Sequence, residues 1–554
     1  MTGNGVHGIC DGYVRDYAVA DPIGATFMGV VGHDGEMTDY SPDGFAARAG
    51  LSRRALAAVR AAERSDDTES VAAAVFAERV GLELEIHDAG LDLASLNVIA
   101  SPVQDIRMVF DLMPSATAQD REQIARRLAA VPEALAGLRA SLRSASDAGH
   151  TAALRQVRKV AEQCDTWAGT GHGRSFFDTL VDSMDGAAEG LRSGAAAAAA
   201  AYAQFATFLR EELAPRAPRR DAVGAERYQL WSRYFLGARL DLAEAYAWGW
   251  EEFARLETEM REVADRISPG ATPVQAAAVL DADPRYQAHG PDGLQRWMQQ
   301  LSDTALEELR GSRFDIPDRL MHLECRIAPP GGGVGAYYTG PDEGFSRPGR
   351  MWWSVPAGKQ EFPTWREVTT VYHEGVPGHH LQVATAVHVG DKLNAFQRLM
   401  CWVSGHGEGW ALYAERLMRE LGYLGDDGNL LGMLDAQLFR AARVVVDIGM
   451  HLELAIPAGT GFHEGQRWTP ELGLEFLLTR TITDPDHVHD EIDRYLGWPG
   501  QAPSYKLGER LWLTAREGAR RRQGAAFDEV AFHRAALEMG SMGLDTLTEQ
   551  LAAL

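Results

Sequence analysis

Long amphipathic runs constrain this chain to a mainly helical fold. Residues 226–267 carry apolar and aromatic side chains at helical spacing, and Pro269 with Gly270 ends the run. Residues 174–213 continue the pattern and include an unbroken alanine run at 195–201. Because aromatic residues follow the alanines at helical spacing, we expect a tightly packed helix there and not a linker.

Two further segments predict a pair of helices and a small β element. Residues 116–163 are typical of paired helices rich in Ala, Leu, Arg and Glu. We expect Pro132 to divide them, because proline cannot donate a hydrogen bond inside a helix. Residues 321–353 alternate short apolar stretches with Gly and Pro clusters, which predicts a small β element.

The chain has 554 residues, too many for one ordinary core. We expect an N-terminal helical region at residues 1–270 and a second, catalytic region at residues 271–554. The boundary would fall near residues 270–290, with the sequence "DADPRYQAHGPDG" as the break. Alternatively, the two regions form one continuous unit.

The charge balance argues against two classes of partner. The formal net charge is -24, with 78 acidic against 54 basic residues. Nucleic acids and anionic membranes need a basic surface, so we expect neither as a main partner. No apolar run approaches the roughly 20 residues of a membrane span, and the N-terminus lacks the pattern of a secretory signal. Four cysteines without regular spacing indicate reduced thiols, and together these features predict a cytoplasmic protein.

The sequence "YHEGVPGHHLQ" at residues 372–382 has the composition of a zinc hydrolase site. Such a site needs three protein ligands, an open position for water and a carboxylate that accepts the proton of that water. His373 supplies a ligand and Glu374 a general base. The second ligand is His379 or His380, six or seven residues after the first.

Neither spacing works on an undisturbed helix. Seven residues return a side chain to the same face but about 10.5 Å further along the axis, and six residues turn it about 120° away. Pro377, between two glycines, has no N–H to donate to the carbonyl of His373. We therefore expect a break in the helix at Pro377 that brings a second histidine beside His373.

A third ligand is available downstream. The helical segment at residues 404–422 opens with Glu408, which completes a set of two histidines and one glutamate. Glu415 lies seven residues later on the same face and is either a hydrogen-bond partner of a ligand or a surface charge. His406 is the rival ligand in this segment.

Other residues are candidates for stabilising the oxyanion of a tetrahedral intermediate. Tyr505 and His451 are the best of them, and Asp447 would orient His451 from one helical turn away. Lys506 and Arg443 could bind a substrate carboxylate or merely pair with acids. Further candidates for the oxyanion are Tyr337 and Tyr338.

The histidine cluster, followed by "EGWALYAE", resembles the bacterial family called domain of unknown function 885. Similar segments occur in order along nearly the whole chain, including "DPIGATFMGVVGHDGEMTDYSP", "GAYYTGP" and "RYLGWPGQAPSYKLGE". The resemblance implies a largely helical fold with a deep cleft and a small β element before the metal-site helix, similar to gluzincin-type zinc peptidases. It also implies His373, His379 and Glu408 as ligands and Glu374 as base. The Gly378–His379 step favours His379 over His380.

These observations predict a zinc-dependent hydrolase of peptide or peptide-like amide bonds, with Zn²⁺ as cofactor. Its substrate would be a peptide or a small amide. One alternative is hydrolysis of a small non-peptide amide or biosynthetic intermediate, and another is a catalytically silent helical binding protein. Manganese or cobalt could occupy the same ligands. The residues between His451 and Trp468 depart from the family pattern as an insertion, which could reshape the substrate rim.

Overall fold

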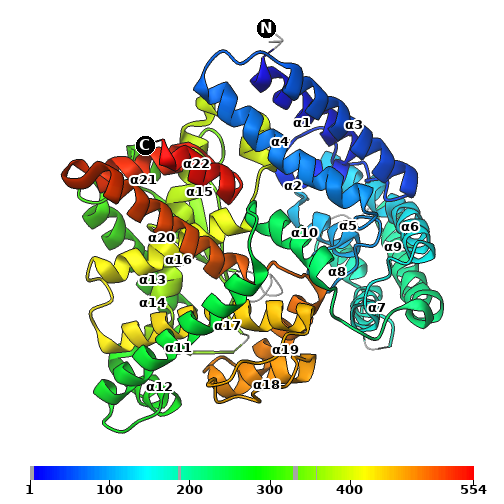
Figure 1. Cartoon of the computed structure of the whole chain (residues 1–554). Coiled ribbons are helices and arrows are strands. Elements are labelled where there is room, and N and C mark those ends of the chain that lie inside the picture. Colours follow the sequence, from blue (N-terminus) through cyan, green and yellow to red (C-terminus); the bar gives the residue numbers. More distant parts are fainter. Residues whose placement is uncertain (1–4, 172, 185–188, 329–334, 357, 554) are drawn as a thin grey trace. The chain divides into compact units, whose positions relative to one another are not determined.

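The chain folds into two compact units. The computed structural model describes residues 5–171, 173–184, 189–328, 335–356 and 358–553 (Figure 1). One unit comprises Met1–Val223 with His489–Trp498, and the other comprises Gly224–Val488 with Pro499–Leu554. The boundary predicted between residues 270 and 271 falls inside the second unit, and the limits of independently folding domains stay a prediction.

Helices make up most of the described residues, which confirms a mainly α fold (Figure 1). The first unit also takes the part of α19 (Pro485–Gly497) that begins at His489. Its other helices are α1 (Val6–Ala20), α2 (Pro22–Met28), α3 (Pro42–Ala61), α4 (Asp67–Asp88), α5 (Pro102–Leu112), α6 (Ala118–Asp147), α7 (Leu154–Ala168), α8 (Phe176–Asp182) and α9 (Glu189–Phe208).

Small residues let α6 and α9 pack closely in the core of the first unit. The predicted alanine run lies inside α9, as expected, and Ala195 and Ala198 are fully buried there. A Cβ added at Gly194 would lie 2.9 Å from the Cβ of Leu128, so the two helices touch at this point. The alanine run is therefore an interface between helices.

Pro132 does not divide α6, so the predicted break was wrong. The helix runs without interruption from Ala118 to Asp147 with Pro132 inside it. A proline in a helix interior costs about 3 kcal/mol. Leu128, Val131 and Leu135 flank it and are buried, and each contributes about 1.5–3 kcal/mol. Burial of this face outweighs the missing hydrogen bond.

The second unit holds the remaining helices. They are α10 (Ala225–Leu236), α11 (Leu242–Ile267), α12 (Pro273–Asp281), α13 (Gly290–Leu309), α14 (Val368–Glu374), α15 (His379–His388), α16 (Ser404–Glu420), α17 (Asp427–Leu452), α18 (Pro470–Arg480), α20 (Ser504–Gln523), α21 (Glu529–Glu538) and α22 (Leu544–Ala552). None of the helices in the described part of the chain is long and apolar enough to cross a bilayer. The cytoplasmic location stays a prediction.

The predicted β element is present before α14. β2 (Leu323–Ile327) pairs in parallel with β4 (Gly349–Trp353), and β3 (Ala336–Thr339) pairs with the other edge of β4 in antiparallel register. Residues 329–334, within the predicted segment, lie outside the described residues. A second small sheet joins β1 (Gln287–His289) to β5 (Glu361–Pro363).

A glycine contact sets the distance between α16 and α20. A Cβ on Gly409 would lie 2.5 Å from the carbonyl carbon of Gly508, closer than real Cβ atoms come to other atoms. Gly405 and Gly508 meet in the same way, with 2.2 Å between a Cβ on Gly508 and the oxygen of Gly405. The backbones of the two helices are therefore in direct contact where they cross.

Candidate metal centre

The helix that carries the histidine cluster is interrupted, as the sequence predicts. α14 ends at Glu374 and α15 begins at His379. Between them Gly375 and Gly378 have ψ angles of -118° and -128°, far from helical values, and the Val376–Pro377 peptide bond is cis. The interruption brings the ring of His379 to 5.0 Å from the ring of His373, centroid to centroid.

His373, His379 and Glu408 form one group of possible metal ligands. Nε2 of His373 lies 3.3 Å from Oε2 of Glu408, and Nε2 of His379 lies 3.6 Å from the same oxygen. All three ligand atoms lie within 4.8 Å of one another. Two atoms about 2.05 Å from a zinc ion at the tetrahedral angle are about 3.3 Å apart. The two separations from Glu408, 3.3 Å and 3.6 Å, are close to this value, so the group is suited to a tetrahedral ion.

Glu415 orients His373. The Nδ1 of His373 lies 2.7 Å from Oε1 of Glu415, and both side chains are buried. An ionised carboxylate only accepts hydrogen bonds, so Nδ1 carries the proton and Nε2 faces Glu408. Of the two roles predicted for Glu415, the structure supports the hydrogen-bond partner, because its side chain is only 2% exposed.

The electrostatics of the group favour a bound cation. Burial alone would lower the pKa of His373, but hydrogen bonds to Glu408 and Glu415 outweigh it and raise the pKa to about 10. Burial would raise the pKa of Glu408, yet its hydrogen bonds with His373 and His379 hold that pKa well below its usual range. Glu415 at Nδ1 and Glu408 at Nε2 thus stabilise a positive charge on the ring of His373. A divalent metal ion would take the place of the proton on Nε2.

Glu374 is buried beside these residues. Burial raises the pKa of its carboxyl group, while the charges of His379 and His373 act in the opposite direction. The guanidinium of Arg440, on α17, also lowers this pKa. A buried carboxyl group with a raised pKa next to a possible metal site is a typical general base.

His380 lies outside the ligand group. Its Nε2 is 2.8 Å from the carbonyl oxygen of Leu320, which can only accept, so Nε2 donates. Its Nδ1 therefore accepts from the hydroxyl group of Tyr338 at 3.0 Å. Burial lowers the pKa of His380 to about 4. Both of its ring nitrogens already have protein partners, which leaves His379 as the second histidine of the group.

The rival ligand His406 also points elsewhere. Its Nδ1 lies 2.8 Å from the amide nitrogen of Gln382, which donates. Burial lowers the pKa of His406 to about 4. His406 is therefore a neutral core histidine in this arrangement.

The predicted catalytic residues Tyr505 and His451 lie on α20 and α17. The guanidinium of Arg443 lies 4.7 Å from the centre of the Tyr505 ring. The ring of His451 is fully buried and its Nε2 lies 3.9 Å from Oδ1 of Asp447, too far for a hydrogen bond. Asp447 instead accepts from the hydroxyl group of Tyr228 at 2.6 Å. The catalytic roles of Tyr505 and His451 stay predictions.

Lys506 has a different environment from the one expected of a substrate-binding residue. Its side chain is 1% exposed, and Nζ lies 3.1 Å from Glu252 and 2.5 Å from Glu509. It also donates to Oε1 of Gln437. A lysine with these partners is a buried structural cation, so it does not offer a free charge to a carboxylate.

Sequence reasoning missed two residues that hold Glu415. The hydroxyl group of Thr369 donates to Oε2 of Glu415 at 2.6 Å, and the amide of Gln437 donates to the same oxygen at 3.4 Å. Thr369 lies four residues before His373, a spacing that places both on one helical face and could have signalled the contact. Gln437 comes from α17, and nothing in its local sequence distinguishes it.

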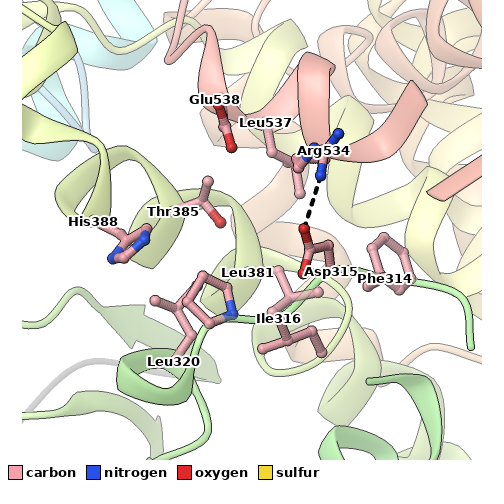
Figure 2. A pocket seen from close by; sticks show the side chains of 11 residues that line it. Phe314, Asp315, Ile316, Leu320, Leu381, Thr385, His388, Arg534, Leu537 and Glu538 are labelled. Carbon is pink, nitrogen blue, oxygen red and sulfur yellow. Dashed lines mark hydrogen bonds and ion pairs between the residues drawn. The ribbon is translucent and has the colours of Figure 1, made fainter. Parts of the chain in front are cut away.

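A pocket of about 420 Å³ lies elsewhere on α15 (Figure 2). Leu381 and His388 line it and are turned about 200° and 180° from His379 around the helix, since each residue adds 100°. The pocket is therefore on the face opposite to His379, and none of the candidate ligands lines it. Its lining residues are Phe314, Asp315, Ile316, Pro317, Leu320, Leu381, Thr385, His388, Arg534, Leu537 and Glu538.

Solved structures share the fold of the whole chain. A lipoprotein candidate from Colwellia psychrerythraea superposes with a TM-score of 0.82 at 22% identity, covering 99% of this chain and 98% of that one. A lipoprotein candidate of unknown function from Shewanella oneidensis gives 0.75 at 17% identity, with coverage of 98% and 99%. Identities this low show a shared fold and nothing of activity.

A third structure, named as an oligoendopeptidase F candidate from Bacillus anthracis, gives a TM-score of only 0.35 at 14% identity, covering 94% of this chain and 93% of that one. No curated protein matches the sequence. A family model described as a bacterial protein of unknown function matches residues 22–551, nearly the whole chain. The chain therefore belongs to the bacterial family of unknown function DUF885.

Proposed function

We propose that this protein is a zinc-dependent hydrolase of peptide or peptide-like amide bonds. The observation that carries the proposal is the placement of His373 between two carboxylates. Its Nε2 faces Glu408 at 3.3 Å and its Nδ1 faces Glu415 at 2.7 Å. A metal-binding histidine typically has this pattern, with one nitrogen toward the ion and the other toward a carboxylate.

Each residue of the centre has a distinct role in the proposal. His373, His379 and Glu408 hold the ion, which when bound would polarise a water molecule and lower its pKa toward neutral. Glu374 accepts the proton of the attacking water and passes it to the leaving amine. The raised pKa of Glu374 suits both steps. A group that first accepts a proton and later returns it works best when its pKa is close to the pH at which the enzyme operates.

Oxyanion stabilisation is assigned to residues outside the ligand group. Tyr505 and His451 are the proposed donors, since the amide carbonyl gains negative charge as water attacks. Arg443 stacks on the Tyr505 ring and would hold that ring in place. This assignment is independent of the metal ligands and is tested separately, by Tyr505→Phe, which removes only the hydroxyl group.

The test of the metal centre is metal content and amide hydrolysis measured on the same purified samples. Wild type is compared with His379→Ala and Glu408→Ala, and with Glu374→Gln. We expect about one zinc ion per chain in wild type and in Glu374→Gln, and little in the two ligand variants. Hydrolysis of a mixed peptide and amide library should disappear in all three variants.

The matched control is His388→Ala. His388 lies on α15 with His379 but is exposed on the opposite face. It should retain both zinc and activity. If His380→Asn lost zinc and His379→Ala kept it, the second ligand would be His380 and not His379. A wild type that binds zinc but hydrolyses no amide would favour the catalytically silent binding protein.

A further inference from the structure

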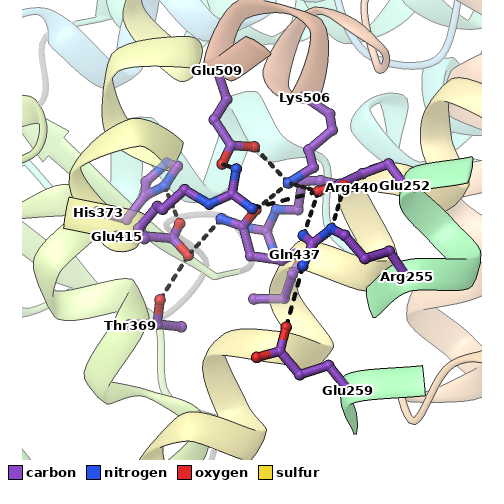
Figure 3. Close-up of polar contacts among 12 residues, drawn as sticks. Glu252, Arg255, Glu259, Thr369, His373, Glu415, Gln437, Arg440, Lys506 and Glu509 are labelled. Atoms are coloured by element: carbon purple, nitrogen blue, oxygen red, sulfur yellow. Dashed lines mark hydrogen bonds and ion pairs between the residues drawn. The ribbon is translucent and has the colours of Figure 1, made fainter. Parts of the chain in front are cut away.

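A buried amide connects Lys506 to the partner of the candidate ligand His373 (Figure 3). Lys506 donates to Oε1 of Gln437, and Nε2 of Gln437 donates to Oε2 of Glu415 at 3.4 Å. An ammonium group only donates and a carboxylate only accepts, so the two ends of the amide cannot exchange. The amide therefore lies with its dipole directed from cation to anion.

The far end of this chain of contacts is fixed independently of the metal centre. Lys506 is paired with Glu252 of α11 and Glu509 of α20. Arg255 makes two hydrogen bonds to Glu252, at 2.7 Å and 2.8 Å (Figure 3). Arg416 lies 3.4 Å from Glu509. Bidentate, partly buried pairs of this kind hold side chains in one geometry. The position of Lys506 is thus set by charges on α11, on α16 and on its own helix, α20.

The near end is equally constrained. Glu415 uses Oε1 for His373 and Oε2 for both Thr369 and Gln437. Removing either donor to Oε2 would let the carboxylate rotate, and the ring of His373 would follow it. A ligand ring turned by a small angle no longer directs its lone pair at the ion.

We propose that Lys506, Gln437 and Thr369 form a relay that positions Glu415, so that the orientation of His373 toward a metal ion is set by residues outside the ligand group. The relay rests on the proposed metal centre. It makes metal affinity depend on the packing of α11, α17 and α20, which contribute no ligand. The competing explanation is that these polar residues only stabilise the fold.

The variants are chosen to separate these explanations. Gln437→Met keeps the length of the side chain and removes both hydrogen bonds of the amide. Thr369→Val keeps the shape and removes the hydroxyl group. Lys506 is not replaced, because its loss would remove the buried cation that Glu252 and Glu509 share and would disturb the fold as well as the metal centre. The control is Thr479→Val, an exposed helical threonine whose hydroxyl group bonds only within its own helix.

The measurements are zinc affinity, by competition with a chromophoric chelator, and the visible absorption spectrum of the cobalt-loaded protein. We expect Gln437→Met and Thr369→Val each to weaken zinc binding about 10- to 100-fold and to change the cobalt spectrum. Thr479→Val should match wild type in both. The melting temperature of the metal-free proteins reports any loss of fold stability separately.

The outcomes are distinguishable. If wild type binds neither zinc nor cobalt, both the relay and the proposed function fail. If wild type binds zinc and the two variants bind it equally well, the relay alone is overturned. A lower melting temperature with unchanged affinity would assign the network to fold stability, which also overturns the relay.

Discussion

His379 and Glu408 lie on different helices, yet Nε2 of the histidine is 3.6 Å from Oε2 of the glutamate. The next residue, His380, faces away and donates its Nε2 to the carbonyl oxygen of Leu320. Adjacent histidines thus have opposite roles, one at the candidate metal centre and one in the core. The turn between α14 and α15 determines which of the two histidines faces Glu408.

Gly378 should be essential to the metal centre. A Cβ added there would lie 1.9 Å from the carbonyl oxygen of His373, a contact that forces the backbone to move. We expect Gly378→Ala to destabilise the protein by about 2–4 kcal/mol and to abolish stoichiometric zinc binding. Gly390→Ala is the control, because the nearest atoms would be at 3.5 Å on the side chain of Arg398. Normal zinc binding by Gly378→Ala would contradict the geometry of the turn.

Glu415 should contribute to metal affinity through its charge. Glu415→Gln keeps the shape of the side chain but weakens the hydrogen bond from Nδ1 of His373. We expect zinc affinity to fall about 10- to 100-fold, as measured by competition titration. Glu420→Gln, on the same helix, is the control, since Glu420 pairs with Arg516 and not with a candidate ligand. An effect of equal size in both variants would show that the loss is not specific to Glu415.

Metal removal should lower the stability of the protein. An ion that binds only the folded state, at a free concentration 100 times its Kd, stabilises that state by about 2.7 kcal/mol. We therefore expect chelation to lower the melting temperature of wild type and zinc to restore it. Glu408→Ala should melt at the same temperature with and without zinc. A zinc-dependent shift of wild-type size in Glu408→Ala would place the binding site elsewhere.

His533 should make the protein sensitive to acid. Burial, together with the charge of Arg516 and against a hydrogen bond with the backbone of Arg313, lowers the pKa of this histidine from 6.5 to about 3. The unfolded chain therefore binds a proton below about pH 6.5 that the folded chain does not bind, and the free energy of unfolding falls as the pH falls. One such group contributes up to about 1.4 kcal/mol per pH unit.

The comparison is between wild type and His533→Gln, with denaturant unfolding measured from pH 7 to pH 4. The variant should lose less stability than wild type over this range. His289→Gln serves as the control, because the side chain of His289 is 74% exposed. Parallel pH profiles for wild type and His533→Gln would show that this histidine does not contribute to acid sensitivity.

The helical fold and the core of the candidate site could be predicted from local sequence. The break at Pro377 and the choice of Glu408 as a candidate ligand follow from residue types and spacing alone. Pro132 was misjudged because its local cost is outweighed by tertiary burial, which the pattern does not measure. Local sequence left two roles open for Lys506, and only the packed structure decides for pairing with acids, since its partners Glu252 and Gln437 come from α11 and α17.

Thr369 and Gln437 show which residues of the candidate site were not predicted from the sequence. Both donate to one oxygen of Glu415, but they come from α14 and α17. The spacing of Thr369 from His373 offered a local signal, whereas the contact of Gln437 with a distant helix leaves no periodic trace in its own segment. Candidate ligands with a characteristic spacing can be predicted from sequence, and so could their partner Glu415, whereas Gln437, which contacts Glu415 from another helix, is found only in the packed structure.

The glycine crossing of α16 and α20 has a consequence for how this family is read in genomes. Gly409 directly follows the candidate ligand Glu408, and Gly409 packs against the backbone of Gly508. A fragment truncated before residue 500 would retain every candidate ligand but lose α20, the helix that Gly409 contacts. A motif search would count that fragment as complete, although α16, which carries Glu408, would have lost its contact with α20.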